Sequence, residues 1–363
     1  MRVCLIGGIF GKPASYRNVV QTTPETVLLD GLRRRGVDAE PRGHFGPFGF
    51  AAFDLVHVHH LSYGALAAVA DAGSAQVVFT PHCEVPPGRL RQRAMRHVIA
   101  RADAVVALSH SELGWQRARY RAHPARQVAI PNGIDVETFR FAPPPPAREP
   151  FELLFVGQLA PVKRVPDLLE ALALLPPGRF RLRLVYQIAT QKRALEQRTR
   201  ELGLDNVEFA GAMTPHQLAA AYRAAHILVL PSGHTEALPS VVTEALLTGR
   251  PVVATRVAAV PEQVRDFGKL VPVGAPCEFA AALARVAADY DRYRVAARDV
   301  AEQTATRVSI DAMVEGHLAL YTRLLDSGRS ARRGSVPLSL AARTLGRRAG
   351  VRAQRAAMAD DPR

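Results

Sequence analysis

Short apolar runs alternate with longer amphipathic stretches along the chain, and this alternation constrains the fold more than any other feature. In the first 142 residues the apolar runs are Val3–Gly7, Asp54–Val58, Val77–Thr80, Ala104–Ser109 and Gln127–Pro131. The stretches between them with helical spacing of Leu, Val and Ala are 22–35, 62–72, 88–101 and 110–121. Because strands and helices that alternate in this way build parallel βαβ units, the sequence predicts an α/β fold with a doubly wound parallel sheet.

Four consecutive prolines at 143–146 interrupt this pattern. Neither a helix nor a central strand accommodates such a run, so it predicts a stiff linker in the polyproline conformation. The alternation then restarts, with predicted strands at Glu152–Val156, Arg181–Tyr186, Asn206–Phe209, His226–Leu230 and Pro251–Thr255, and predicted helices at 164–175, 190–203, 214–225 and 239–248. We therefore expect two Rossmann-like doubly wound domains facing a cleft, at 1–142 and 151–308, joined by a Pro-rich linker at 143–150.

The last part of the chain carries a different pattern. Helical spacing continues over 276–304 and 309–326, and we expect the helix at 309–326 to cross back to the first domain. Residues 327–363 are rich in Arg, Gly and Ser and poor in large apolar side chains, which predicts a basic, disordered tail.

The net charge of +14 is unevenly distributed along the chain. Residues 1–150 carry 18 Lys or Arg and 12 Asp or Glu, residues 151–326 carry 20 and 19, and residues 327–363 carry 9 and 2. A positive field favours anionic partners. The arginines at 89, 91, 93 and 96 either form a solvated face or contact an anionic membrane, as the tail could also do. Nucleic acid is not an expected partner, because no recognition motif or aromatic platform accompanies the charge.

The cysteines and the apolar runs bear on the compartment. Cys4, Cys83 and Cys277 are far apart and lack the spacing of metal ligands, which favours a reduced compartment. No apolar run approaches the roughly 20 residues that span a bilayer. We expect a cytoplasmic protein, either free or peripheral at the inner face of the membrane. His57 and His59 share one strand face, but without further ligands they are interpreted as polar strand-end residues rather than a metal pair.

Three loops after predicted strands are candidate ligand sites. Gly7-Gly8 ends the first strand and is either a close backbone approach for a ligand or a plain turn. After the first strand of the second domain, Gly157 is followed by Lys163 and Arg164 near a helix start, where a cation can hold a diphosphate. The alternative for Lys163 is an ordinary surface residue of a βα loop.

The third loop, 231–245, follows an apolar strand and opens a helix at Pro239, a favoured first helical position. The free amides near Leu238, Ser240 and Val241 would form an anion site. Glu236 precedes the helix and Glu244 lies eight residues further on, and carboxylates suit sugar and ribose hydroxyls because they accept hydrogen bonds at two oxygens. The alternative is a helix N-terminus with ordinary dipole-compensating acids.

Two motifs together resemble a known family. Ile130–Asp135 looks like the "IPNGID" signature, and Glu236…Glu244 looks like the E-x7-E motif, of the retaining glycosyltransferases of family 4, which have the GT-B fold. Gly7-Gly8, Thr80-Pro81-His82, Gly157…Lys163 and Pro261-Glu262 match in order, so the resemblance extends to about Tyr321. The chain departs from the family where a Gly-Gly pair before Pro-Glu is replaced by Ala258-Ala259.

The resemblance implies a transfer of a sugar from a nucleotide-sugar donor to an unknown acceptor (a glycan, glycolipid or small metabolite) with retention of configuration. It implies that Glu236 and His82 are the catalytic pair, with Glu236 at the sugar hydroxyls and His82 near the sugar or acceptor. The implied donor-binding residues are Gly8, Lys163, Arg164, Leu238, Pro239, Ser240 and Glu244. No metal or other cofactor is expected. The alternatives are a GT-B scaffold or weakly active nucleotide-sugar-binding protein, and a GT-B epimerase or phosphorylase.

Overall fold

The computed structural model describes residues 1–19, 23–46, 48–82, 88–233 and 237–328, and the chain divides into two compact units. Unit 1 comprises Met1–Ala107, Leu113–Ile130 and the chain from Val314 onward. Unit 2 comprises Leu108–Glu112 and Pro131–Met313.

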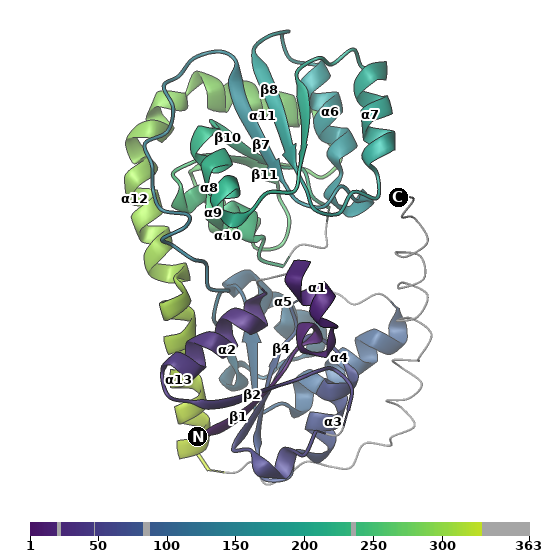
Figure 1. Ribbon diagram of the computed structural model, residues 1–363, viewed down its shortest axis with the longest axis vertical. Coiled ribbons are helices and arrows are strands. Elements are labelled where there is room, and N and C mark those ends of the chain that lie inside the picture. The colour runs from purple at the N-terminus through teal and green to yellow at the C-terminus, as the bar shows by residue number, and fades with distance from the viewer. Residues whose placement is uncertain (20–22, 47, 83–87, 234–236, 329–363) are drawn as a thin grey trace. The chain divides into compact units, whose positions relative to one another are not determined.

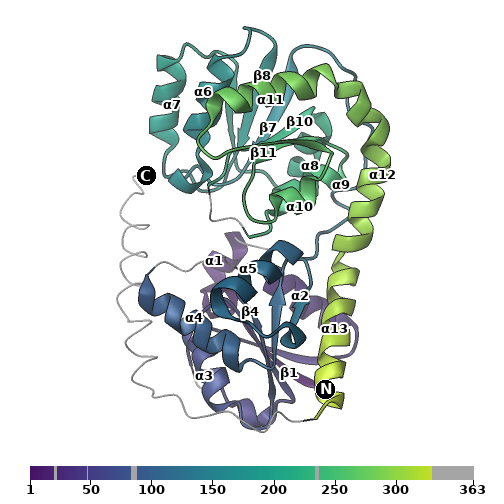
Figure 2. The same ribbon diagram turned by 180° about the vertical axis from the view of Figure 1, so that it is seen from behind.

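Unit 1 contains a six-stranded parallel sheet in the order β2-β1-β3-β4-β5-β6 (Figures 1 and 2). Its strands are β1 (Arg2–Ile6), β2 (Asp38–Arg42), β3 (Leu55–His59), β4 (Gln76–Thr80), β5 (Ala104–Ala107) and β6 (Gln127–Ala129). Its helices are α1 (Ala14–Val19), α2 (Pro24–Arg34), α3 (Tyr63–Asp71), α4 (Arg89–Arg101), most of α5 (His110–Tyr120) and most of α13 (Ile310–Asp326), with 3-10 turns at Gly8–Gly11, Phe50–Ala52 and Pro124–Arg126. Within this unit, α3 and α4 lie on one side of the sheet and α13 on the other, as Figure 2 shows.

Unit 2 repeats the architecture with a parallel sheet in the order β12-β11-β10-β7-β8-β9. Its strands are β7 (Phe151–Val156), β8 (Phe180–Val185), β9 (Val207–Gly211), β10 (Ile227–Leu230), β11 (Val252–Thr255) and β12 (Gly268–Val271). Its helices are α6 (Val165–Ala173), α7 (Lys192–Glu201), α8 (Pro215–Ala224), α9 (Ser240–Leu247), α10 (Val260–Val264), α11 (Pro276–Ala288) and α12 (Tyr290–Val308), with a 3-10 turn, η4, at Pro161–Lys163. Two six-stranded parallel sheets confirm the predicted α/β fold class.

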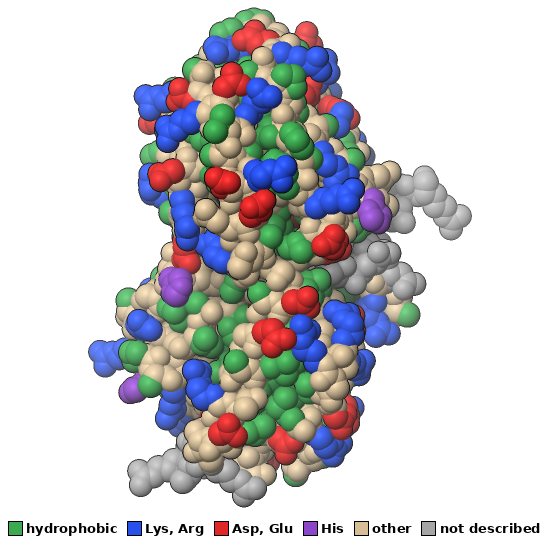
Figure 3. Space-filling model, turned by 90° about the vertical axis from the view of Figure 1, so that its left-hand side faces the viewer, with side chains coloured by type: hydrophobic (Ala, Val, Ile, Leu, Met, Phe, Trp, Pro, Cys, Tyr) green, Lys and Arg blue, Asp and Glu red, His purple; other side chains and the backbone are tan. Residues whose placement is uncertain are grey.

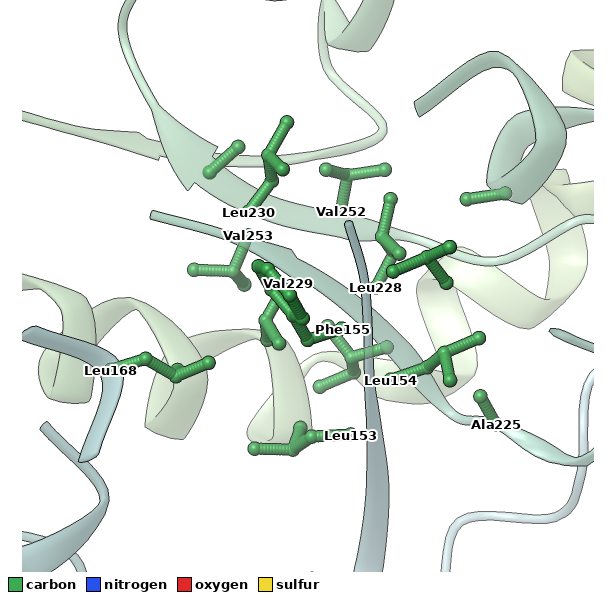
Figure 4. Close-up of a cluster of buried hydrophobic side chains, with 14 of the residues drawn as sticks. Leu153, Leu154, Phe155, Leu168, Ala225, Leu228, Val229, Leu230, Val252 and Val253 are labelled. Atoms are coloured by element: carbon green, nitrogen blue, oxygen red, sulfur yellow. The ribbon is translucent and has the colours of Figure 1, made fainter. Parts of the chain in front are cut away.

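The core of unit 2 explains why its strands were readable as apolar runs. The central strands β7, β10 and β11 are covered by helices, and their side chains are buried on both faces of the sheet (Figure 4). Leu154, Phe155 and Val229 are each at most 1% exposed. A strand of this kind needs an apolar residue at every position rather than at every second one.

The proline run at 143–146 lies against unit 2. The Nε2 atom of His226 donates to the carbonyl oxygen of Pro146 at 3.2 Å, and Nη1 of Arg250 donates to that of Ala142 at 2.6 Å. The division between the units falls after Ile130, ahead of the segment that we expected to be the linker. The segment 143–150 is therefore part of unit 2, and α13 belongs to unit 1 from Val314 onward.

The predicted helix at 276–304 is two helices, α11 and α12, which meet at Asp289. The face of the molecule in Figure 3 shows basic and acidic side chains intermingled, with hydrophobic side chains in small patches between them. Among the described residues, no helix has the length and apolarity that a membrane span requires. The tail from residue 329 lies outside the described residues.

Candidate functional site

The strand order of unit 2 marks one point where a ligand can approach the sheet. The chain leaves β7 toward β8 on one side and later returns through β10 on the other, so the order reverses between β7 and β10. In open parallel sheets, ligands bind outside the carboxyl ends of the strands at such a switch point. The loops that follow β7 and β10 are the two loops that carry Lys163 and Glu236.

The structure brings these two loops into contact. The backbone N–H of Gly233, after β10, donates to the carbonyl oxygen of Val162 in η4 at 2.8 Å. A Cβ atom added to Gly157 would lie 3.7 Å from Cε of Lys163, so the lysine side chain runs beside the end of β7. Lys163 and the loop after β10 therefore share one edge of the sheet, as a diphosphate site between them requires.

Arg164 is the second predicted cation, and its guanidinium is already engaged. Its Nε and Nη2 atoms donate to the two carboxylate oxygens of Asp167 at 2.6 and 3.1 Å. Arg164 itself has a φ of +49°, at the left-handed junction between η4 and α6. Because two of its donors are committed to Asp167, Arg164 has fewer donors left for a diphosphate.

The start of α9 differs by one residue from the expected position. Pro239 is the residue before the helix, with φ −66° and ψ 116°, and the helix begins at Ser240, which is exposed. The Nε2 atom of Gln263 on α10 donates to the carbonyl oxygen of Pro239 at 3.1 Å and to Oγ1 of Thr243 at 2.8 Å. Gln263, which the sequence did not single out, thus ties α10 to the first turn of α9. Leu238 is half-buried beside this turn, and Glu236 lies outside the described residues.

Glu244 is a buried carboxylate on α9, only 8% exposed. The hydroxyl of Tyr222, on α8, donates to its Oε2 atom at 2.8 Å. Burial raises the pKa of Glu244, and hydrogen bonds from Tyr222 and Ser240 act in the opposite direction. A buried carboxylate whose hydrogen bonds come from neutral hydroxyls is costly to a fold, which is typical of a functional residue. Tyr222 was missed because its partner is 22 residues away in sequence.

The departure at Ala258 has a structural consequence. Ala258 has a φ of +43°, in the left-handed region where glycine is favoured. The next residue, Ala259, donates its N–H to the carbonyl oxygen of Ala237 at 3.3 Å, beside the start of α9. The chain therefore keeps the backbone conformation that suits the family's glycine although the side chain has changed.

In unit 1 the strand order reverses between β1 and β3, and Gly7-Gly8 follows β1 at that point. A Cβ atom on Gly7 would lie 3.0 Å from Cγ of Glu25, and one on Gly8 would lie 3.1 Å from Cε1 of His44. The two glycines therefore make room for polar side chains of the protein itself. This is a more specific reason for the pair than a plain turn.

Four histidines and a glutamate gather at this edge of unit 1. His59 at the end of β3 lies 2.7 Å from His82, measured from Nδ1 to Nε2. His44 donates from Nε2 to the carbonyl oxygen of His59 at 3.1 Å, and Nε2 of His60 lies 3.3 Å from Oε1 of Glu25. Although burial alone would raise the pKa of Glu25, hydrogen bonds from His60 and Thr23 lower it to about 2. The predicted residues Gly8 and His82 thus lie in one polar cluster of unit 1.

His57, on the same strand, is held by two hydroxyl groups. Its Nδ1 lies 2.6 Å from the hydroxyl of Tyr321 on α13, and its Nε2 lies 2.7 Å from Oγ1 of Thr80. Within the described parts of the chain, no group of three or more His, Cys, Asp or Glu side chains is arranged to hold a metal ion. His57 and His59 are parts of hydrogen-bonded networks.

The segment 130–135 is tightly packed on both sides of the unit boundary: Ile130 packs within unit 1, and Gly133 and Ile134 pack within unit 2. A Cβ atom on Gly133 would lie 2.8 Å from Cα of Ile310, and the N–H of Ile134 donates to the carbonyl oxygen of Val308 at 2.8 Å. Ile130 is 4% exposed and lies against Gly316 of α13. The Asn-Gly turn is therefore fixed by the junction of α12 and α13, and its part in the site is structural.

The comparisons with known proteins agree with these features. Residues 150–289 match the model of the family described as "Glycosyl transferases group 1", and residues 27–138 match "Glycosyltransferase Family 4". The D-inositol 3-phosphate glycosyltransferase of Geodermatophilus obscurus is 31% identical over 79% of this chain and 70% of its own length. That of Saccharomonospora viridis is 32% identical over 72% and 69%.

Solved structures share the fold. Sucrose-phosphate synthase from Thermosynechococcus elongatus superposes with a TM-score of 0.74 at 21% identity, covering 90% of this chain and all of that one. HepE from Anabaena, in complex with UDP, superposes with a TM-score of 0.71 at 18% identity, covering 89% of this chain and all of that one. The two parallel sheets, the matching family models and the relatives together show that the chain belongs to the glycosyltransferases of family 4. It is a retaining enzyme that uses a nucleotide sugar.

Proposed function

We propose that the switch point of unit 2 binds the donor's nucleoside diphosphate, with Lys163 at the phosphates and Glu244 at the ribose. The observation that carries this proposal is the buried carboxylate of Glu244. Glu244 lies on α9, the helix that follows the loop beside Lys163, and it accepts a hydrogen bond from the hydroxyl of Tyr222 on α8. HepE, which has the same fold, binds UDP and UDP-glucose, which supports a uridine nucleotide as the first donor to test.

Each predicted residue has a role in this proposal. Leu238, Pro239 and Ser240 shape the phosphate loop, Arg164 assists Lys163, and Gly8 offers a backbone N–H from unit 1. Glu236 contacts the sugar hydroxyls, and His82 lies near the sugar or acceptor. The lysine charge stabilises the departing diphosphate as the sugar takes on oxocarbenium character. We propose that this cation serves where other enzymes use a divalent metal.

Replacing Lys163 with Met should lower kcat/KM for the nucleotide sugar about 100-fold, because the charge on the leaving diphosphate loses a fixed cation. The measurement is sugar transfer or hydrolysis from UDP-, GDP- and ADP-sugars, followed by release of the nucleotide. Lys192→Met is the matched control, since Lys192 pairs with Glu196 on the solvent face of α7. Unchanged kcat/KM in Lys163→Met would exclude this lysine from the donor site.

Replacing Tyr222 with Phe should weaken binding of the nucleoside diphosphate about 10-fold and leave its 2′,3′-dideoxy analogue unaffected. Without the tyrosine hydroxyl the carboxylate of Glu244 loses a donor, and its pKa rises further. As the pH is lowered, nucleotide binding should therefore begin to decline at a higher pH in the variant than in the wild type. Calorimetric titration at several pH values measures both effects.

The matched control is Tyr290→Phe. Tyr290 is also buried in unit 2, but among the described residues its hydroxyl has no hydrogen-bond partner. Equal losses for the ribose and dideoxy nucleotides in Tyr222→Phe would show that Tyr222 acts only through packing.

For the acceptor we propose a small phosphorylated polyol. The relatives that match the chain are named D-inositol 3-phosphate glycosyltransferases, and the positive excess in residues 1–150 favours an anionic acceptor. Inositol 3-phosphate and unphosphorylated inositol, each tested with the donor that binds, distinguish the classes by mass spectrometry of the product. Equal transfer to both would remove the phosphate from the proposal.

We also propose a peripheral contact between α4 and an anionic membrane surface. The helix Arg89–Arg101 carries five arginines and no acidic residue, and Leu90 on it is 51% exposed. Flotation with vesicles of phosphatidylglycerol should retain the protein at low salt, whereas phosphatidylcholine vesicles should not. Replacing Arg89, Arg93 and Arg96 with Gln should abolish the retention. If it persists undiminished, α4 is not the contact.

A further inference from the structure

The contact between His59 and His82 links the end of β3 to the residue that the family resemblance places near the substrate. Nδ1 of His59 and Nε2 of His82 are 2.7 Å apart. Two neutral imidazoles at that distance share one hydrogen, so one nitrogen donates and the other accepts. Burial lowers the pKa of both rings, that of His82 to about 3, so both are neutral at neutral pH. Which ring donates is decided by the rest of the cluster.

The second ring nitrogen of His59 decides the direction. Nε2 of His59 is buried and has no hydrogen-bond partner among the described residues. If the proton of His59 were on Nε2, a buried N–H would be left without an acceptor, and orphaned buried N–H groups are rarer in proteins than under-used acceptors. With the proton on Nδ1, His59 donates to His82 and only a bare nitrogen is left unpaired. Nε2 of His82 is then the acceptor, and its own proton is on Nδ1.

The surroundings hold the ring of His82 in one orientation. His82 has a φ of +56°, and its ring lies 4.9 Å from that of His59 and 4.6 Å from that of His60. His60 in turn lies 3.3 Å from the buried carboxylate of Glu25. A ring with neighbours on two sides and one nitrogen engaged has only Nδ1 left for a ligand.

We propose that His59 is a positioning residue that fixes His82 in the Nδ1–H tautomer, so that His82 meets the substrate as a hydrogen-bond donor. A ring in this form can stabilise charge on a sugar or acceptor oxygen, and it cannot accept a proton at Nδ1. The tautomer is a property of the free protein, and only its catalytic consequence rests on the proposed function.

The tautomer can be read directly by long-range 15N–1H NMR of the full chain labelled in histidine, without substrate. Two internal references have tautomers set by their partners. His44 and His226 each face a backbone carbonyl oxygen through Nε2 and must carry the proton there, and Nδ1 of His226 also accepts from the N–H of Glu152 at 3.0 Å. We expect His82 to show the opposite pattern, with a protonated Nδ1 and a bare Nε2. The same pattern as His44 and His226 would overturn the proposal.

Two variants of His59 separate positioning from packing. His59→Asn keeps an amide donor near the place of Nδ1 and should leave the tautomer of His82 and kcat largely unchanged. His59→Phe keeps the bulk and removes the donor, so His82 should become a mixture of tautomers and kcat should fall roughly 10-fold at unchanged donor KM. His123→Asn, at an exposed position of unit 1, is the control, and thermal unfolding of each variant confirms folding.

The outcomes distinguish this inference from the proposed function. If the wild type transfers no sugar from any nucleotide tested, the proposed function fails while the NMR spectrum still decides the tautomer. If transfer occurs and His59→Phe and His59→Asn have equal kcat, His59 does not position His82.

Discussion

Lowering the pH from 7 to 5 is expected to reduce the free energy of unfolding of unit 1 by roughly 2–6 kcal/mol, a large part of the stability of a typical domain. The cause is the lowered pKa of three histidines of unit 1. Burial lowers the pKa of His57 and His59 well below 6.5 and that of His82 to about 3, with the neighbouring histidines adding to the effect. His82 stays neutral in the folded protein at pH 5, and all three rings bind protons less readily in the folded protein than in the unfolded chain.

The direction follows from proton binding. Below pH 6.5 the unfolded chain binds more protons than the folded one, so acid favours unfolding. Each histidine contributes about 1.4 kcal/mol per pH unit below 6.5, until the pH reaches its folded pKa. Glu25, whose pKa is lowered to about 2, adds a further loss below pH 4.5. Stability should therefore be full above pH 6.5 and fall steadily below it.

The single tryptophan makes the measurement specific to unit 1. Trp115 lies in this unit and packs edge-on against Tyr120, with 5.3 Å between ring centroids, so its fluorescence follows the unfolding of unit 1 in urea. His59→Asn should reduce the loss at pH 5, because one histidine whose pKa is lowered by burial is gone. A urea midpoint that does not move between pH 7 and pH 5 would contradict the lowered pKa values of these three histidines.

Unit 2 provides the contrast within the same chain. Burial also lowers the pKa of His226, but burial raises the pKa of Glu244, so the folded unit binds a proton there before the unfolded chain does. Protonation of Glu244 therefore stabilises the folded unit on acidification, and this gain offsets the loss of stability that His226 causes. Hydrogen exchange resolved by peptide should show unit 1 opening at a higher pH than unit 2.

The sequence predicted those elements whose physical cause is local. The buried strands β7, β10 and β11 were predictable because each contains at least three consecutive apolar residues. β2 was not, because Asp38–Arg42 is polar, pairs with β1 alone and contains a proline that only an edge strand tolerates. The break at Asp289 between α11 and α12 was missed because neither glycine nor proline marks it.

The same distinction holds for the site. Lys163 and the loop before α9 could be placed from glycines and strand ends, and the structure brings the two loops together. Tyr222 and His59 carry no local signal, since they act on residues 22 and 23 positions away that only the tertiary fold brings near. The sequence therefore predicted which loops come together, and the side-chain contacts made by Tyr222 and His59 became apparent only in the fold.

Arg250→Met is expected to lower the free energy of unfolding of unit 2 by about 3–5 kcal/mol, because it leaves buried polar groups without their partner. Arg250 is 0% exposed, and burial lowers its pKa to about 10, so it remains charged at neutral pH. Its guanidinium donates to four backbone carbonyl oxygens, those of Ala142, Arg223, Ala225 and Thr248. Three of these end α8 or α9, where a cation also meets the negative end of the helix dipole.

The two helices that Arg250 joins carry residues of the proposed donor site, with Tyr222 on α8 and Glu244 on α9. Arg250→Met should therefore also weaken nucleotide binding at temperatures below the melting temperature. The reason is that the hydrogen bond between Tyr222 and Glu244 depends on how these two helices pack. Urea unfolding followed by circular dichroism measures the stability, and calorimetry at 25 °C measures the binding.

Arg250→Lys, which keeps the charge without the planar fork of the guanidinium, should have a stability between those of the wild type and Arg250→Met. Arg193→Met, on the exposed face of α7, should change neither quantity. A Met variant within 1 kcal/mol of the wild type would mean that the carbonyl groups find other partners, and that α8 and α9 are held by their apolar contacts alone.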